Sequence, residues 1–322
     1  MMSMRLFWSS IVLIGVLNAV AANGQERIHF LIPGGAGGGW DMTARAVGES
    51  LSRSGVIKIA SYENLSGGFG GRAIAHLIET APRQKNTLMV NSGSFTLRYL
   101  LNKFPYSYRD LTPIASVIAD YGAFVVRIDS PYRKWQDVID DYRKDYRRVN
   151  IAGGSSRGST DHVVAALAFS KSGLDISRLK YIPYNAGGQA MVGLLSGETQ
   201  MLSTGLSEAV GLASQGEVRV LAITAPKRLP LFPDVPTLLE QGVDAVFANW
   251  RGFFGPPNLS NEEAEVHKQL IRELRGQHNW QKICSERGWS DFHRSGNDFI
   301  TFLTGQEQKL SELLLDLGLL KN

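Results

Sequence analysis

Short apolar runs alternate with amphipathic stretches along most of the chain. The runs are rich in Val and Ile and are continuous rather than alternating, which is typical of strands buried on both faces of a sheet. Strands are expected at 27–33, 56–62, 87–92, 149–153, 179–184, 199–204, 218–225 and 245–254, and helices at 41–53, 70–80, 94–103, 134–146, 159–172, 187–196 and 206–215. This order predicts an α/β fold with largely parallel sheets.

Two segments interrupt the alternation. Residues 112–128 and 245–255 are each long, extended and continuous, so we expect them to run from one lobe of the protein into another. The segment after residue 255 reads as helices at 260–275, 277–287 and 296–318, with no strand of its own, and is expected to pack on the first lobe. The predicted architecture is therefore two α/β lobes joined by two crossing strands, with a cleft between them.

The N-terminal segment has the pattern of a signal peptide. A short basic start at 1–5 precedes an apolar stretch at 6–20 and the small residues Ala21 and Ala22. The apolar stretch is short for a membrane span, although an uncleaved anchor is the alternative. We assign 1–22 to the signal peptide and expect the rest of the chain to be exported. Lobe 1 is expected to comprise 26–124 together with 251–322, and lobe 2 to comprise 125–250.

Composition and charge exclude several classes of protein. The net charge is +4 and the basic residues are scattered, with the densest group at 143–148 interleaved with aspartates, which is the pattern of a solvated helix face and not of a nucleic-acid groove. The single cysteine, Cys284, forms no disulfide within the chain and is expected to be buried. No His, Cys and Asp cluster has the spacing of a zinc site. We expect no nucleic acid, metal or cofactor.

A glycine-rich loop follows the first predicted strand. Five of the six residues at 34–39 are glycine, and a helical pattern begins at Asp41. A strand, a glycine loop and a helix N-terminus together form an anion site, because backbone N–H groups converge and the helix dipole adds positive charge. Asp41 either caps free N–H groups, orients the loop or meets a ligand amine. The candidate ligand-binding residues here are Ala36, Gly37, Gly38, Trp40 and Asp41.

Four more loops of this kind occur, at 64–71, 91–94, 153–160 and 184–189. Each follows a predicted strand and precedes a helix, and ligands of α/β sheets bind at the carboxyl ends of strands. Arg157 either forms a fork with a ligand carboxylate or faces solvent. Arg72 and Arg98 are expected on the surface, and Trp250 either in the core or at the cleft wall. The candidates from these loops are Ser92, Ser94, Ser155, Ser156, Arg157, Ser159, Tyr184, Gly187 and Gly188.

Two catalytic or nucleotide patterns compete with this interpretation. The opening loop matches neither G-x-G-x-x-G nor the P-loop, and the G-x-G-x-x-A match at 68–73 begins too far from its strand. Residues 154–158 match G-x-S-x-G, so Ser156 is the nucleophile of an alternative serine hydrolase. The histidines far enough downstream are His267, His278 and His293, whereas His162 is too close. Ser156 as a hydroxyl donor or turn residue is the favoured interpretation.

The chain resembles the solute-binding receptors of tripartite tricarboxylate transporters, also called Bug receptors. The resemblance covers nearly all of the exported chain, and its markers are the segments 33–45, 67–71, 153–162, 184–197 and 221–236. It implies a Venus-flytrap fold in a periplasmic protein, and a receptor rather than an enzyme. It also implies that the loops at 34–41 and 184–188 grip a ligand carboxylate and that the lobes close on the ligand.

The same resemblance implies a partner and a ligand class. Integral membrane subunits of the transporter are expected to recognise the closed form, and we expect the receptor itself to be a monomer. Trp40 and Asp41, after the glycines, are closer to the tricarboxylate-type members of the family. The expected ligand is therefore a di- or tricarboxylate, with a citrate-like compound favoured.

Overall fold

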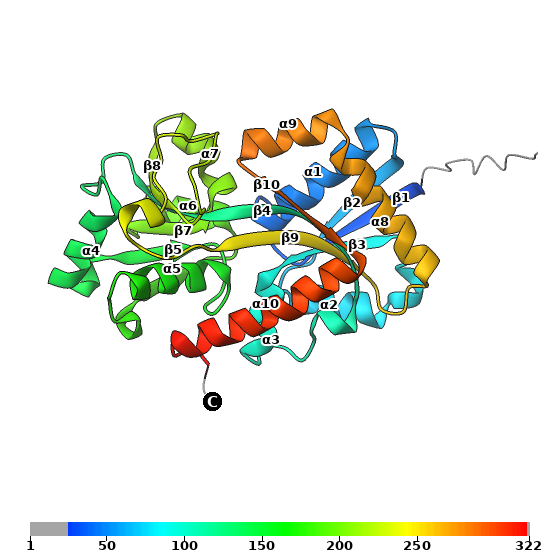
Figure 1. Ribbon diagram of the computed structural model, residues 1–322, viewed down its shortest axis with the longest axis horizontal. Coiled ribbons are helices and arrows are strands. Elements are labelled where there is room, and N and C mark those ends of the chain that lie inside the picture. Colours follow the sequence, from blue (N-terminus) through cyan, green and yellow to red (C-terminus); the bar gives the residue numbers. More distant parts are fainter. Residues whose placement is uncertain (1–24, 321–322) are drawn as a thin grey trace, which may run out of the picture.

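The computed structural model describes residues 25–320, which form two α/β halves side by side (Figure 1). The predicted signal peptide at 1–22 lies outside the described residues. The first half contains parallel strands in the order β2-β1-β3. Its elements are β1 (Gln25–Ile32), α1 (Gly39–Arg53), β2 (Ile57–Asn64), α2 (Gly71–Glu79), β3 (Thr87–Ser92) and α3 (Gly93–Leu100).

The second half repeats this layered arrangement. Strand β5 lies between β7 and β6 and is parallel to both. Strand β8 runs along the same sheet, antiparallel to the long strand β4 (Thr112–Arg127). The elements are α4 (Trp135–Lys144), β5 (Asn150–Gly153), α5 (Thr160–Lys171), β6 (Lys180–Pro183), α6 (Gly187–Leu195), β7 (Met201–Gly205), α7 (Leu206–Ser214) and β8 (Val218–Ile223).

Two long strands connect the halves, which confirms the predicted crossing strands. Strands β4 (Thr112–Arg127) and β9 (Ala248–Gly255) pair with each other antiparallel from Thr112 and Gly255 to Tyr121 and Ala248. Strand β9 also pairs with β3 of the first half, and the end of β4 pairs with β7 of the second. The strands therefore form one curled mixed sheet that continues through both halves (Figure 1).

The C-terminal segment differs from the prediction in one respect. It contains the expected helices α8 (Asn261–Arg275), α9 (His278–Arg287) and α10 (Gly296–Asp316), but also a strand, β10 (Ser290–Ser295). Strand β10 pairs antiparallel with β4, so the expectation of a tail without a strand was wrong. The sequence of β10 is mostly polar and only half-buried, so it lacks the apolar run on which the prediction relied.

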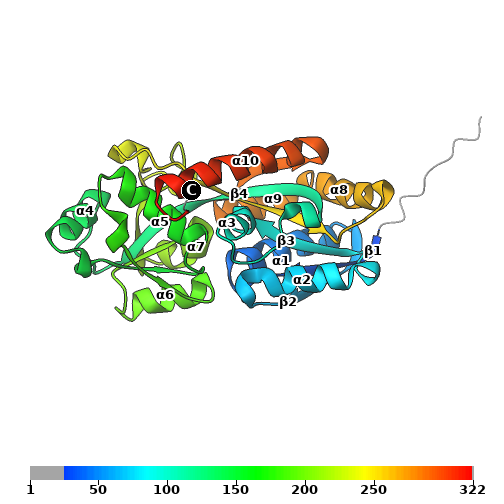
Figure 2. The same cartoon turned by 90° about the horizontal axis from the view of Figure 1, so that it is seen from below.

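Helix α10 packs on both halves and not only on the first. Phe299 and Leu303 lie in a core cluster of the first half, whereas Leu310 and Leu314 complete the main core of the second. Figure 2 shows the helix running along both. The lobe bounds inferred from the sequence stay a prediction.

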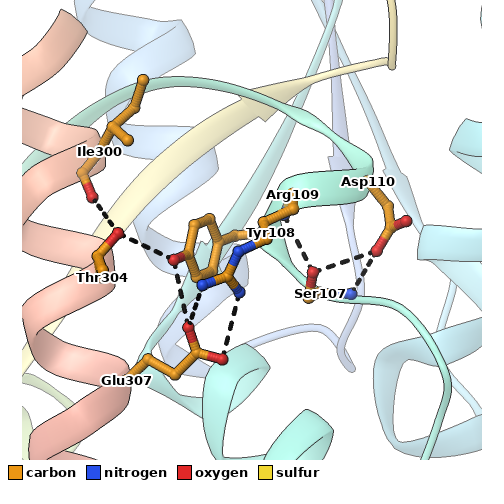
Figure 3. Close-up of polar contacts among 7 residues, drawn as sticks. All are labelled: Ser107, Tyr108, Arg109, Asp110, Ile300, Thr304 and Glu307. Carbon is orange, nitrogen blue, oxygen red and sulfur yellow. Dashed lines mark hydrogen bonds and ion pairs between the residues drawn. The ribbon is translucent and has the colours of Figure 1, made fainter.

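The middle of α10 is fixed to the turn that precedes β4 (Figure 3). The Tyr108 hydroxyl lies 3.2 Å from Thr304 Oγ1 and donates to Glu307. Arg109 donates through both terminal nitrogens to the Glu307 carboxylate, with Nη2 at 2.6 Å from Oε2. These contacts hold the helix in register on the first half. None of the helices in the described part of the chain is long and apolar enough to cross a membrane.

Candidate functional site

A cavity of about 410 Å³ lies between the two halves. It is bordered by the loops at the carboxyl ends of β1, β2, β3, β5 and β6, as the sequence predicts, and by residues of α7 and β9. Its lining is Pro33, Gly34, Gly35, Gly38, Gly39, Trp40, Ser66, Gly67, Gly68, Gly70, Ser92, Ser94, Arg98, Gly154, Ser155, Ser156, Thr160, Asp161, Pro183, Tyr184, Asn185, Ala186, Gly187, Glu208, Asn249 and Arg251.

Helices α1, α3, α5 and α6 begin at this cavity. Residues in the first turns of α1, α3, α5 and α6 line it, namely Gly39, Ser94, Thr160 and Gly187. The first N–H groups of a helix have no partner within the helix, and the dipole places partial positive charge there. Two of the helices belong to each half. The cavity therefore has the geometry of an anion site shared between the halves.

Asp41 fixes the conformation of the glycine loop. Gly37 has φ of +76°, a left-handed conformation that favours glycine, and its backbone N–H donates to Asp41 Oδ2 at 3.0 Å. Arg45 and Asn64 both donate to Asp41 Oδ1. The N-cap of α1 is Gly38, which makes no side-chain capping bond. Asp41 therefore orients the glycine loop, which is one of the three roles expected from the sequence.

A cluster of hydroxyl groups joins α3 of the first half to α5 of the second. Ser94 Oγ lies 3.0 Å from Ser159 Oγ and 2.6 Å from Thr160 Oγ1. Ser159 is fully buried and also accepts a hydrogen bond from Arg98 Nη2 at 3.1 Å. By contrast, Ser156 lines the cavity, and its Oγ is buried without a hydrogen-bond partner among the described residues. The Ser156 hydroxyl therefore keeps its hydrogen-bonding capacity unused within the described protein.

Arg98 belongs to the cavity, although the sequence suggested a surface position. It is only 7% exposed, and its guanidinium lies over the Trp40 ring at 5.1 Å from the centroid. Burial lowers the pKa of Arg98 to about 10, which leaves it charged at neutral pH. The expected surface position of Arg98 was wrong. Ser94 and Arg98 are four residues apart on one face of α3, and both line the cavity, so the spacing of Arg98 from the predicted Ser94 indicates its position.

Arg251 brings a second guanidinium to the cavity. It is buried on β9, and its Nη2 lies 2.7 Å from Asp120 Oδ2 on β4. Its Nη1 donates to Thr43 Oγ1 at 3.1 Å, and Asp120 also accepts the Ser207 hydroxyl at 2.6 Å. The pair thus links both crossing strands to α1 and α7. Neither residue is among the candidates predicted from the sequence, because both lie in extended segments that predict crossing strands.

Two acidic residues also line the cavity. Asp161 lies in the first turn of α5, where burial and the nearby Glu208 carboxylate raise its pKa to about 7. Burial also raises the pKa of Glu208, against the effect of Arg251. Glu208 accepts a hydrogen bond from Thr204 Oγ1 at 2.5 Å and from the backbone of Gly39. No glycine loop contains these acids, so loop motifs did not reveal them.

The structure places the predicted ligand-binding residues in two groups. Those that line the cavity are Gly38, Trp40, Ser92, Ser94, Ser155, Ser156, Tyr184 and Gly187. Those that do not line it are Ala36, Gly37, Asp41, Arg157, Ser159 and Gly188. Arg157 is exposed and donates to the backbone carbonyl of Tyr181. Trp250 is a core residue, and its indole N–H donates to Gln306.

The surroundings of Ser156 lack the hydrogen-bonded base of a nucleophile. Within residues 25–320 its hydroxyl has no partner. His162 accepts the Gly158 N–H at Nδ1, and burial together with Arg157 lowers its pKa to about 4. His267 and His293 contact backbone carbonyls in the first half instead. In the described part of the chain, no group of three His, Cys, Asp or Glu side chains could hold a metal ion.

Comparison with known proteins agrees with this geometry. The family model described as "Tripartite tricarboxylate transporter family receptor" matches residues 44–319. The periplasmic binding protein BugD is 19% identical, with a TM-score of 0.83, and the match covers 92% of this chain and 99% of BugD.

Two solved structures from Rhodopseudomonas palustris contain bound acids. MatC with bound malate is 20% identical with a TM-score of 0.80, and the match covers 89% of this chain and 99% of MatC. Rpa4515 with adipate is 22% identical with a TM-score of 0.82, and the match covers 91% of this chain and 97% of that protein. At these identities the likeness shows the fold, which is that of two-lobed periplasmic binding proteins.

Proposed function

Because the chain belongs to the receptor family of tripartite tricarboxylate transporters, we propose that it captures a small carboxylate in the cavity between its halves and delivers it to a membrane transporter. The observation that carries the proposal is the convergence of four helix N-termini on one cavity, two from each half. Those N–H groups replace the water that an anion loses on entering the site.

The side chains of the cavity support a carboxylate as the anion. Arg98 and Arg251 supply guanidinium groups, whose geometry matches a carboxylate, and the unpartnered Ser156 hydroxyl is a further donor. A volume of about 410 Å³ lies within the usual range of small-molecule sites. We propose a di- or tricarboxylate, with a citrate-like compound first among the candidates. The malate of MatC and the adipate of Rpa4515 support this class.

We propose that the receptor acts in the periplasm as a monomer and is not an enzyme. Closure of the halves over the ligand would couple binding to transport, provided that the ligand binds the closed form more tightly. Membrane subunits would then recognise the closed form. This step is tested by comparing uptake of the bound acid in cells that lack the receptor gene with uptake in the same cells after the gene is restored. Only the restored cells are expected to take up the acid.

A thermal-shift and calorimetric screen of organic acids tests binding. Citrate, other tricarboxylates and dicarboxylates are expected to raise the melting temperature, whereas sulfate and uncharged sugars are not. Absence of any carboxylate response would contradict the proposal.

The hydrolase alternative is tested separately with Ser156→Ala and an ester substrate. The receptor proposal expects no turnover in either protein, and weaker carboxylate binding in the variant because a donor is lost. Ester hydrolysis that disappears on substitution would favour the hydrolase.

A further inference from the structure

Part of the cavity lining consists of hydrogen-bond acceptors. Asp161 on α5 and Glu208 on α7 line the cavity and are both only partly buried, so each keeps surface toward it. Asn249 on β9 lines the same cavity, and its side-chain Oδ1 is buried with no hydrogen-bond partner among residues 25–320. We call Asp161, Glu208 and Asn249 the acceptor wall. These acceptors cannot form hydrogen bonds with the carboxylates of a ligand, because an ionised carboxylate has no hydrogen to donate.

The charges in the cavity lining also disfavour a ligand that carries carboxylates alone. The charged side chains of the lining are Arg98 and Arg251 against Asp161 and Glu208. Asp120, which is not part of the lining, forms an ion pair with Arg251 and offsets its charge. A ligand that presented only carboxylates to the acceptor wall would meet like charge in a partly desolvated site, which is unfavourable.

The acceptor wall has hydrogen-bonding capacity to spare. An ionised carboxylate accepts about four hydrogen bonds. Glu208 accepts two, from Thr204 and from the Gly39 backbone, and Ser155 interacts with Asp161. The raised pKa values of both acids show that the protein alone compensates their charge incompletely. A ligand group that donates hydrogen bonds would complete the shell, whereas a ligand without one leaves buried acceptors unsatisfied.

We propose that the ligand bears a hydrogen-bond donor, a hydroxyl or an ammonium group, that binds Asp161 and Glu208 while its carboxylate lies at the helix N-termini. The substrate class is then hydroxy- or aminocarboxylates rather than plain polycarboxylates. This inference rests on the proposed function and narrows it. Citrate, which carries a hydroxyl, falls within the class.

Matched acids that differ in one group test the inference by calorimetry at pH 7.5. Succinate, malate and aspartate share a four-carbon skeleton and differ by hydrogen, hydroxyl and ammonium, while tricarballylate and citrate differ by one hydroxyl. We expect a donor-bearing acid to bind at least about tenfold more tightly than its plain counterpart. Malate and citrate report a hydroxyl preference, and aspartate reports an ammonium preference.

Substitutions locate the preference. Asp161→Asn and Glu208→Gln keep the size of each side chain and remove the charge, and each is expected to reduce the preference to within about threefold. Glu262→Gln, at an exposed position on α8, is the matched control and should keep the full preference. The melting temperature of each variant without ligand confirms folding.

The outcomes separate this inference from the proposed function. Equal binding of plain and donor-bearing acids would overturn the inference and leave a carboxylate receptor standing. A preference that survives in both acid variants would also overturn it, since the selecting group would lie elsewhere. If no carboxylate of the thermal-shift screen binds, these five included, both the inference and the proposed function fail.

Discussion

Replacement of Arg251 by methionine tests how burial changes the value of an ion pair. Arg251 Nη2 lies 2.7 Å from Asp120 Oδ2, and the two side chains are 3% and 0% exposed. Arg275 and Asp291 have the same chemistry and the same 2.7 Å separation, but are 45% and 60% exposed. Because residue types and the shortest distance agree, a comparison of Arg251→Met with Arg275→Met sets a buried pair, together with its Thr43 hydrogen bond, against an exposed one.

The expected magnitudes differ severalfold. Arg251→Met leaves the Asp120 carboxylate buried with the Ser207 hydroxyl and N–H as donors, and loss of one partner of a buried pair costs about 3–5 kcal/mol. Arg275→Met should cost less than about 1 kcal/mol. With an unfolding entropy of about 0.6 kcal/mol/K for about 300 residues, these costs lower the melting temperature by about 5–8 °C and by less than about 2 °C.

Scanning calorimetry without ligand, at one pH and salt concentration, measures both shifts. Circular dichroism spectra of the two variants check that the fold is kept. Equal shifts in the two variants would refute the reasoning, because the exposed pair should contribute far less to stability than the buried one. A loss below about 1 °C for Arg251→Met would refute it as well.

Three further predictions use thermal unfolding. Gly187→Ala places a Cβ against the Glu208 carboxylate on α7 and should lower the melting temperature. Gly188→Ala, with no atom within 4 Å of its Cβ, should not, and equal effects would contradict the clash. Asp161, with its pKa raised to about 7 from about 3.9 unfolded, contributes stability below about pH 4 that is lost as pH rises to about 7. The melting temperature of Asp161→Asn relative to that of the wild type should therefore rise from pH 5 to pH 8. A difference in melting temperature that does not change with pH would contradict this. Leu314→Ala in the core should lower the free energy of unfolding by about 2–5 kcal/mol. Leu315→Ala, at the exposed neighbouring position, should lower it far less. Similar losses would show that α10 does not pack on the second half through Leu314.

Most of the fold could be predicted from the sequence because buried strands and amphipathic helices leave a periodic signal. Each expected strand and helix is present, with ends shifted by a few residues. Strand β10 has no such signal, since its polar residues pair with β4 through the backbone.

The site was predictable only as far as its loops. The glycine loops indicate backbone N–H donors, and several of their residues line the cavity. The charged residues could not be found in this way, because their roles depend on contacts with residues that are distant in the sequence. Arg251 and Asp120 are 131 residues apart and meet only in the folded protein. Asp161 and Glu208 each occupy a first helical turn, where an acidic residue is ordinarily explained by the helix dipole alone.

The position of α10 has a consequence for the order in which the protein folds. Leu310, Leu314 and Leu317 belong to the core of the second half, although nearly all of its other members precede residue 250. The first half in turn needs β9, Phe299 and Leu303. During synthesis, a growing chain thus completes neither of these two core clusters until helix α10 has left the ribosome. Such late, long-range contacts slow folding, and both halves keep apolar surface exposed in the nascent chain.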